Sequence, residues 1–440
     1  MLSHSDADLV RRDPVIPGLA MLLDSTALAG CLRRHVGRDD VEVGPTTYIK
    51  YQPGRNCLIG FELKVGTTCV PAHAAAYRFD ARDKLDRARN GPGESGPLGP
   101  GRVAFDQEII VLSVFPNDRK LTSLPVLADS KARQRLLSDL VPAYPELWQC
   151  SACTIVHKPQ LRYVASVLSA PDSGILLKLY SARDYGVAAT NARALSQYPH
   201  VGLARLRGTS DAHALLAFEW IPGQLLSEVL PALANQTQVL EEVGKVLAAL
   251  HALEPVGLPI LSRQAECKAL ADIAEAIGAL CPHLAAKAMV LAGKLRSALA
   301  GLPPISRPIH GDFYARQLVI TAQDVRILDL DSTVRSDPSQ DLGNFIGYLE
   351  REALRGNLTP LRVAEMGQAL IAGYQGGASG FRPSAAGLYS AVGLFRMGLK
   401  PFRNREPDWQ ERIEALMTRV EQLLAAAPRP IVVNERTRVG

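Results

Sequence analysis

One segment in the C-terminal half of the chain carries polar side chains whose types and spacing suit phosphoryl transfer. His310, Gly311 and Asp312 are consecutive, Gln317 lies five residues after Asp312, and Asp329 follows an apolar run. Carboxylate and amide oxygens hold hard cations such as Mg²⁺ together with substrate phosphates. Phosphoryl transfer also uses an Asp beside the attacking hydroxyl. The pattern therefore predicts Asp312 as the catalytic residue, and Gln317 and Asp329 as the metal ligands.

A short hairpin is predicted to position these side chains. Apolar runs at residues 318–320 and 325–328 flank a polar turn at residues 322–324, which is typical of two antiparallel strands. Carboxylates and an amide that precede and follow one hairpin can converge on a single point. The alternative is that these are ordinary turn carboxylates, with Asp341 as a helix cap, because it precedes an apolar helical run.

Several spaced motifs together resemble one known family. They are His-Gly-Asp, Gln317, the Asp nineteen residues after His310, the Asp337-Pro338 pair and the Asp341-Leu342-Gly343 triplet. This set resembles the aminoglycoside phosphotransferase family, which comprises small-molecule relatives of the protein kinases. Gln317 stands where Asn is usual, but it keeps the amide oxygen, and maltokinase-like members also carry Gln there.

The resemblance extends over residues 146–427 and implies a fold and an activity. The expected fold is α+β and protein-kinase-like, with a β-rich N-lobe and a helical C-lobe. The expected reaction moves the γ-phosphoryl group of ATP to a small-molecule hydroxyl with the help of Mg²⁺. Asp312 would orient and deprotonate that hydroxyl. His310 would shape the loop through hydrogen bonds, and Asp331 is a weaker candidate for supporting the metal.

A second hairpin resembles the part of the kinase N-lobe that closes over ATP. Residues 164–168 and 175–180 would form its strands, with Ser173 in a turn whose backbone N–H groups can meet phosphate oxygens. Lys178 stands where the lysine that contacts the α- and β-phosphates belongs. A strand at residues 214–221 would lead to the hinge, with the backbone from Glu219 to Ile221 facing adenine. The alternative for Lys178 is a snorkelling or edge-strand lysine.

The helix after this hairpin lacks the expected partner for the lysine. No Glu occurs between Lys178 and His200, so Asn191 or Asp184 would have to substitute. The helix itself is predicted at residues 188–198. This gap keeps a second hypothesis open, in which the protein is a nucleotide-binding pseudokinase that scaffolds or regulates a partner protein.

Similar residues recur at a constant spacing in the N-terminal half. The numbers of Pro53 and Pro159 differ by 106, as do those of Pro116 and Pro222. We infer two copies of a β-rich unit, at residues 41–124 and 146–230, although chance matching is an alternative. The first copy places Tyr77 where the second has Lys178, so it is predicted to be a degenerate lobe that acts as a cap or as a wall on the substrate side. The predicted domains are a cap (1–145), an N-lobe (146–222), a helical C-lobe (223–427) and a tail (428–440).

The predicted acceptor side is rich in positive charge. Residues 381–405 contain no acidic residue and five basic ones, namely Arg382, Arg396, Lys400, Arg403 and Arg405. Positive charge in the site would disfavour a polycationic aminoglycoside and favour a sugar or another neutral or anionic metabolite. A solvated basic face is an equally good interpretation of the same residues.

Composition sets outer limits on the function. The chain has 440 residues, ordinary apolar and charged fractions and a net charge of +5, which is too mild to indicate nucleic-acid binding. Seven cysteines with a single CxxC at Cys150 and Cys153 do not suggest zinc or redox chemistry. No apolar run is long enough to span a membrane. We expect a cytoplasmic enzyme that binds a small-molecule acceptor, with a protein partner possible for the N-terminal domain.

His251, in a predicted helix at 238–253, is expected to be a packed structural histidine.

Overall fold

The computed structural model describes residues 2–233, 235–377 and 380–426, and it confirms the α+β class. The predicted tail at 428–440 lies outside the described residues. The chain divides into two compact units. The first comprises the chain up to Ala189 together with Leu206–Trp220 and Lys400–Gln410, and the second comprises Thr190–Arg205, Ile221–Leu399 and the chain from Glu411 onward. No helix among the described residues is both long enough and apolar enough to cross a lipid bilayer.

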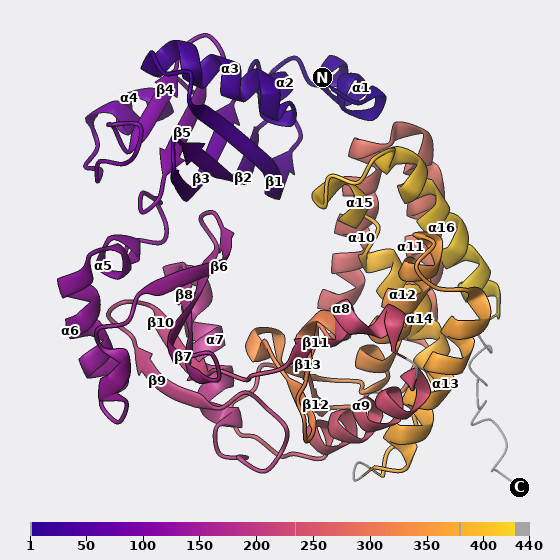
Figure 1. Ribbon diagram of the computed structural model, residues 1–440. Coiled ribbons are helices and arrows are strands. Elements are labelled where there is room, and N and C mark those ends of the chain that lie inside the picture. The colour runs from indigo at the N-terminus through magenta and orange to yellow at the C-terminus, as the bar shows by residue number, and fades with distance from the viewer. Residues whose placement is uncertain (1, 234, 378–379, 427–440) are drawn as a thin grey trace, which may run out of the picture. The chain divides into compact units, whose positions relative to one another are not determined.

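Two antiparallel five-stranded sheets dominate the first unit (Figure 1). Their strand orders are β1-β2-β3-β5-β4 and β6-β7-β8-β10-β9, so the second sheet repeats the connectivity of the first, as the inferred duplication requires. The strands of the first sheet are β1 (Val41–Gln52), β2 (Asn56–Val65), β3 (Thr68–Tyr77), β4 (Arg102–Phe105) and β5 (Ile110–Val114). Those of the second are β6 (Ala152–Lys158), β7 (Arg162–Ala170), β8 (Ser173–Tyr180), β9 (Leu206–Ser210) and β10 (Leu215–Glu219).

Strand register corrects one detail of the predicted repeat. Lys178 pairs with Val164 across β7 and β8, and Ala75 pairs with Leu58 across β2 and β3. Because Val164 and Leu58 are 106 residues apart, Ala75 is the counterpart of Lys178, and the prediction of Tyr77 was wrong. The first hairpin is longer than the second, so the offset drops to 103 residues after the turn.

Short helices accompany both sheets. In the first part of the unit, α3 begins after Asp24, whose side chain accepts hydrogen bonds from the backbone N–H groups of Thr26 and Ala27, and it ends at Gly37 in the left-handed region. The leucines of α5 and α6 share a buried cluster with β7, β8 and β10. These helices are α1 (His4–Arg12), α2 (Leu19–Leu23), α3 (Ser25–Val36), α4 (Asp83–Asn90), α5 (Leu124–Ala128), α6 (Ser130–Leu140) and α15 (Lys400–Arg403).

Helix α7 (Ala182–Leu195) begins six residues earlier than the predicted 188–198. The Ser181 hydroxyl donates to Asp184 Oδ2 at 2.5 Å, and the Ser181 carbonyl accepts from the N–H groups of Asp184 and Tyr185. Ser181 therefore starts the helix.

Helices pack closely around the core of the second unit, helped by glycines at their contacts. A Cβ at Gly343 of α12 would lie 2.3 Å from the backbone of Tyr389 on α14, and one at Gly244 of α9 would lie 2.3 Å from the Leu370 carbonyl of α13. The longer helices, drawn in crimson to yellow in Figure 1, are α9 (Gln236–His251), α10 (Arg263–Leu280), α11 (Ala285–Ala300), α12 (Ser339–Leu354), α13 (Pro360–Gln375), α14 (Ala386–Arg396) and α16 (Trp409–Ala426).

Small strands interrupt these helices. The predicted hairpin exists: β13 (Leu318–Ile320) pairs with β14 (Val325–Ile327), and β11 (Gln224–Leu225) adds to the outside of β13. Next to this sheet in sequence, β12 (Arg307–Ile309) pairs with β15 (Val334–Ser336). Strand β12 leads into the His-Gly-Asp segment, and β15 leads into α12, so the hairpin lies between two paired strands in the chain.

Candidate active site

The loop that carries Asp312 turns sharply at Gly311. Gly311 has a φ of +82°, and a Cβ there would lie 2.3 Å from the carbonyl oxygen of Ser332. A side chain at this position would meet both a left-handed backbone and a fixed carbonyl. Glycine therefore lets the loop lie against the segment after Asp329, and Asp312 itself remains exposed.

His310 fastens this loop to the hairpin. Its ring is fully buried, its Nε2 lies 2.8 Å from the carbonyl oxygen of Leu328, and its Nδ1 lies 3.3 Å from the N–H of Asp312. The carbonyl can only accept and the N–H can only donate, so these bonds place the proton of the neutral ring on Nε2. His310 thus acts through hydrogen bonds on both sides of the hairpin, in line with the role expected for it.

Asp341 is the anchor of the loop. Its Oδ2 accepts from the His310 N–H at 2.6 Å and its Oδ1 from the Gly311 N–H at 2.9 Å. Oδ2 also lies 3.0 Å from Nε2 of His251, whose Nδ1 is 2.9 Å from the hydroxyl of Tyr374. Asp341 is fully buried and His251 is 1% exposed. A network from three helices therefore fixes the backbone beside Asp312.

The helix-cap interpretation of Asp341 was wrong. Its carboxylate bonds to the loop rather than to the start of α12. There, the N–H of Ser339 donates instead to Oδ1 of Asp337 at 2.8 Å. His251 is a packed histidine, as predicted, but it also forms part of the support for the loop. The sequence offered only the Asp-Leu-Gly triplet as a signal, since the bonds join residues thirty or more positions apart.

Gln317 and Asp312 come together at the open end of the hairpin. The side-chain amide of Gln317, 8% exposed, donates from Nε2 to Oδ2 of Asp312 at 3.5 Å. The Gln317 carbonyl accepts from the N–H of Leu328 at 2.8 Å, and this bond extends the hairpin pairing by one step. Asp329 is the next residue, with a left-handed φ of 57°. The backbone thus brings all three predicted residues to one end of the hairpin.

Asn191 braces the segment that follows Asp329. Its Nδ2 donates to the carbonyl oxygens of Asp331 and Thr333 at 3.1 and 2.9 Å, and the residue is fully buried. The two proposed substitutes for the missing Glu therefore make other contacts, since Asp184 accepts from Ser181. Bracing by Asn191 was not predicted, because an isolated Asn in a helix carries no sequence signal.

Lys178 lies in the first unit, in the centre of its sheet. Strand β8 pairs with β7 on one side and β10 on the other, so the edge-strand alternative was wrong. Lys178 is 5% exposed, and its Nζ lies 5.2 Å from the ring centroid of Phe218. A buried ammonium on a central strand requires polar contacts, which distinguishes it from a solvated surface lysine.

The other predicted nucleotide-binding residues lie at strand ends. Ser173 is exposed at the start of β8. Glu219 ends β10, and its Oε2 lies 3.1 Å from Nη2 of Arg207. The N–H of Trp220 donates to the Gly174 carbonyl at 3.1 Å. The hinge strand and the Ser173 turn are thus adjacent within the first unit. Ile221, which is half-buried, is the first residue of the next segment of the second unit.

Part of the predicted basic cluster is neutralised by distant carboxylates. Arg396 lies 3.0 Å from Glu266, which is 2% exposed, and Arg405 lies 2.6 Å from Asp6. Burial lowers the pKa of Arg403 below its ordinary value. The net positive charge around residues 381–405 is therefore smaller than their own sequence indicates, because carboxylates from other parts of the chain pair with them.

Comparison with known proteins agrees with the resemblance found in the sequence. Residues 192–383 match the model of the family described as "Phosphotransferase enzyme family". No curated protein matches the chain. A choline kinase from Cryptosporidium parvum Iowa II is similar in structure, with 13% identity and a TM-score of 0.50 over 68% of this chain and 96% of that one. This similarity confirms the kinase-like fold.

Two further structures are similar over comparable lengths. A choline/ethanolamine kinase family protein from Mesorhizobium loti is 18% identical, with a TM-score of 0.46 over 68% of this chain and 99% of that one. A macrolide 2′-phosphotransferase from Brachybacterium faecium is 18% identical, with a TM-score of 0.42 over 66% of this chain and 98% of that one.

Proposed function

Because residues 192–383 match the model of the phosphotransferase enzyme family, we propose that the protein is a small-molecule kinase that transfers the γ-phosphoryl group of ATP to an alcohol hydroxyl. The observation that carries the proposal is the anchored loop. Buried Asp341 holds the backbone of His310 and Gly311, and the exposed carboxylate of Asp312 is thereby presented beside Gln317. Such preorganisation is what phosphoryl transfer requires of the protein.

Asp312 is proposed to orient the acceptor hydroxyl and to take its proton as the phosphoryl group moves. Its exposed carboxylate can reach an acceptor, while its N–H is fixed to His310. Hydrogen bonding from Gln317 Nε2 holds the carboxylate. Asp331 contributes through its backbone, which Asn191 fixes next to Asp329.

The donor atoms at the end of the hairpin fit Mg²⁺. The amide nitrogen of Gln317 faces Asp312, so its side-chain oxygen and the Asp329 carboxylate supply the oxygen ligands that this ion prefers. When bound, Mg²⁺ would neutralise charge on the ATP phosphates. Gln317 and Asp329 are the residues proposed to hold it.

The proposed nucleotide-binding residues are Lys178, Ser173 and Glu219 of the first unit and Ile221, which begins a segment of the second unit. Lys178 is proposed to contact the α- and β-phosphates, the backbone at Ser173 to cover them, and the backbone from Glu219 to Ile221 to bind adenine. Burial of Lys178 in a central strand supports its role, because such a position fixes an ammonium that a surface lysine would leave mobile.

A sugar or a related neutral or anionic metabolite is proposed as the acceptor. Five basic residues within 381–405 support this choice by charge, and two of them, Arg396 and Arg405, are paired with carboxylates. Two of the proteins similar in structure are named as a choline kinase and a macrolide 2′-phosphotransferase, and these names state different acceptors. The fold itself therefore accommodates several classes of acceptor. An acceptor screen should therefore include cationic alcohols as the competing class.

The proposal is tested by calorimetry of Mg²⁺-ATP binding together with ATP hydrolysis and transfer to a panel of acceptors. Asp312→Asn should bind nucleotide almost normally and lose about 10²–10⁴-fold in turnover, as is typical for removal of a general base. Asp329→Ala should lose the magnesium-dependent part of nucleotide binding. Asp324→Asn, in the exposed turn of the same hairpin, is the matched control and should behave as the wild type.

Each outcome distinguishes the kinase from the pseudokinase. Turnover that depends on Asp312 establishes the kinase. Nucleotide binding without transfer to any acceptor in the panel favours the scaffold or regulator. Full turnover by Asp312→Asn would contradict the mechanism, and no nucleotide binding at all would contradict both functions.

A further inference from the structure

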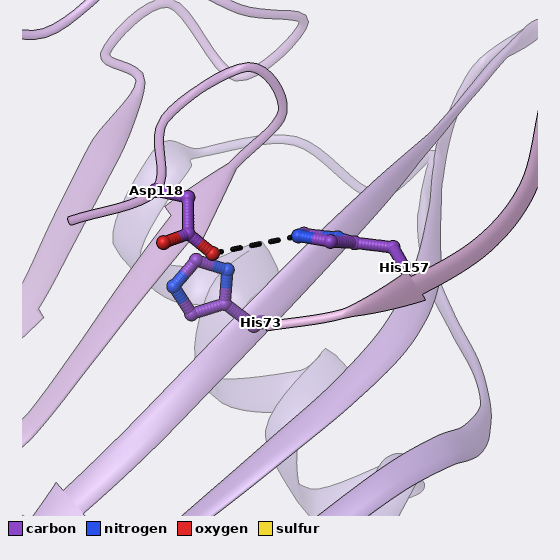
Figure 2. Close-up of side chains that lie close together, drawn as sticks. All are labelled: His73, Asp118 and His157. Atoms are coloured by element: carbon purple, nitrogen blue, oxygen red, sulfur yellow. Dashed lines mark ion pairs between the residues drawn. The ribbon is translucent and has the colours of Figure 1, made fainter. Parts of the chain in front are cut away.

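Two histidines and one aspartate of the first unit gather at a point unrelated to the candidate active site (Figure 2). His73 lies on β3 of the first sheet, His157 lies on β6 of the second, and Asp118 follows β5. One ligand atom from each side chain lies within 4.8 Å of the other two. Nε2 of His157 is 3.5 Å from Oδ2 of Asp118. Side chains from both sheets therefore converge.

The cluster is shielded from solvent, but its imidazoles are poorly satisfied. His73 is 4% exposed, and the side chains of His157 and Asp118 are 6% and 0% exposed. Among the described residues, Nδ1 of His73 and both ring nitrogens of His157 are buried without a hydrogen-bond partner. Buried polar atoms normally have partners, so three unpaired nitrogens in one cluster call for a bound group.

The aspartate is held in place by backbone N–H groups from both sides. Its Oδ1 accepts from Lys120 at 2.8 Å and from Leu121 at 3.1 Å, and its Oδ2 accepts from Gln160 at 2.8 Å. Outer hydrogen bonds of this kind orient the ligands of metal sites. The carboxylate of Asp118 is thus held in one orientation, in which its Oδ2 lies beside Nε2 of His157.

The three side chains offer the kinds of donor atom that a cation requires, because neutral imidazole nitrogen and ionised carboxylate oxygen are the forms that bind metals.

We propose that His73, Asp118 and His157 bind one Zn²⁺ ion that fastens the first sheet to the second. Two imidazoles and a carboxylate form a common zinc ligand set, and imidazole distinguishes this site from an all-oxygen Mg²⁺ site. With zinc–ligand bonds of about 2.0–2.1 Å, the edges of a tetrahedron are about 3.3–3.4 Å. The separation of 3.5 Å between His157 and Asp118 already meets this length. The fourth position is left to a water molecule.

The test uses the full-length chain without an affinity tag. Elemental analysis of protein purified without chelators should find about one zinc per chain. After removal of the metal, titration with Co²⁺ should produce the visible absorption of a tetrahedral ion bound to nitrogen and oxygen. His73→Ala, His157→Ala and Asp118→Asn should each weaken metal binding roughly tenfold or more. His35→Ala replaces an exposed histidine of the same unit and should leave binding unchanged.

Melting curves report on the role of the ion. Zinc should raise the melting temperature of the metal-free wild type and of His35→Ala, but not that of His157→Ala. Less than about one tenth of an equivalent of metal, together with no cobalt spectrum in the wild type, would overturn the proposal, and this result does not depend on whether any variant folds. Equal metal affinity in wild type and His157→Ala would also overturn it, and a metal other than zinc would overturn the choice of ion.

Discussion

Alanine substitutions at two glycines should distinguish the cost of a left-handed backbone from the cost of a steric clash in the loop that carries Asp312. Gly311 and Gly356 have nearly equal φ values of +82° and +81°, but a Cβ at Gly356 meets no atom within 4 Å. Gly356→Ala should therefore cost only the left-handed penalty of about 1–2 kcal/mol and leave activity intact. Gly311→Ala adds a clash with Ser332, so it should destabilise the protein further and depress turnover.

The measurements are urea unfolding and the rate of ATP turnover for the two variants side by side. Equal turnover in both would contradict the role given to the contact between the loop and Ser332.

The buried carboxylate of Asp341 should be sensitive to a change of one atom. In Asp341→Asn, the amide NH₂ group would face a backbone N–H where the second oxygen now accepts. The mismatch leaves a buried donor unsatisfied, at a cost of about 1–3 kcal/mol in the free energy of unfolding. Chemical denaturation measures this, and turnover should fall because the loop loosens.

Asp324→Asn again serves as the control, since surface substitutions usually change stability by about 0.5 kcal/mol or less. A loss for Asp341→Asn no larger than the control's would show that the network does not hold the loop.

Sequence reasoning worked for Asp312, Gln317 and Asp329 to the extent that motif spacing and one hairpin place them together. It failed for Asp341, because the bonds of its carboxylate to His310 and Gly311 join residues far apart in the chain. No local pattern distinguishes such a residue from a helix cap. The roles of the site residues stay predictions that the variants above test.

Glycines at the contacts between helices set how closely those helices approach. Gly343→Ala would place a Cβ 2.3 Å from the backbone of Tyr389, and such overpacking costs about 1–3 kcal/mol. Gly387→Ala, on exposed helical surface of α14 with nothing within 4 Å, should instead stabilise the protein by about 0.4–1 kcal/mol. Thermal or urea unfolding of the pair should show shifts of opposite sign, and shifts of the same sign would refute this account of the α12–α14 contact.

Helix positions followed well from apolar periodicity. The predicted helix at 238–253 became α9 at Gln236–His251, since a 3.6-residue pattern is local and survives in any tertiary setting. Strand register was less accessible. The identification of Tyr77 as the counterpart of Lys178 failed because the paired strands of the first hairpin are longer, while both turns hold two residues. The register beyond a turn therefore depends on strand lengths that no local pattern shows.

At the scale of the whole chain, the two sheets share a topology but differ in chemistry. Ala75 occupies the register position that Lys178 has in the second sheet, so the first sheet lacks the residue proposed to contact phosphate. The duplicated architecture therefore supports a structural use of the first copy, which matches its proposed metal link to the second.

The distribution of thiols gives a test that samples the entire molecule. No disulfide joins the seven cysteines, all of which lie among the described residues; Cys57 and Cys281 are buried, and Cys69 and Cys153 are exposed. Burial raises the pKa of Cys57 to about 12, and a hydrogen bond with Glu62 raises the pKa of Cys69. Reaction with a disulfide reagent at pH 8 should therefore be fastest at Cys153 and should spare the two buried thiols until the protein unfolds.

Peptide mapping after short labelling identifies the modified sites, and denaturant should release all seven. Rapid modification of Cys57 in the native protein would contradict the packing of the first sheet.

The turn of the β13–β14 hairpin closes on itself. Thr321 bonds to Asp324 through its N–H at 2.9 Å and through its hydroxyl at 2.8 Å, and its Oγ1 accepts from Gln323 at 3.1 Å. At about 3.3 Å per strand residue, the four steps from Gln317 to Thr321 place the turn roughly 13 Å from the end that carries Gln317 and Asp329. A fluorescent reporter attached at Gln323 would leave those contacts in place, so it could follow the proposed nucleotide binding without altering Gln317 or Asp329.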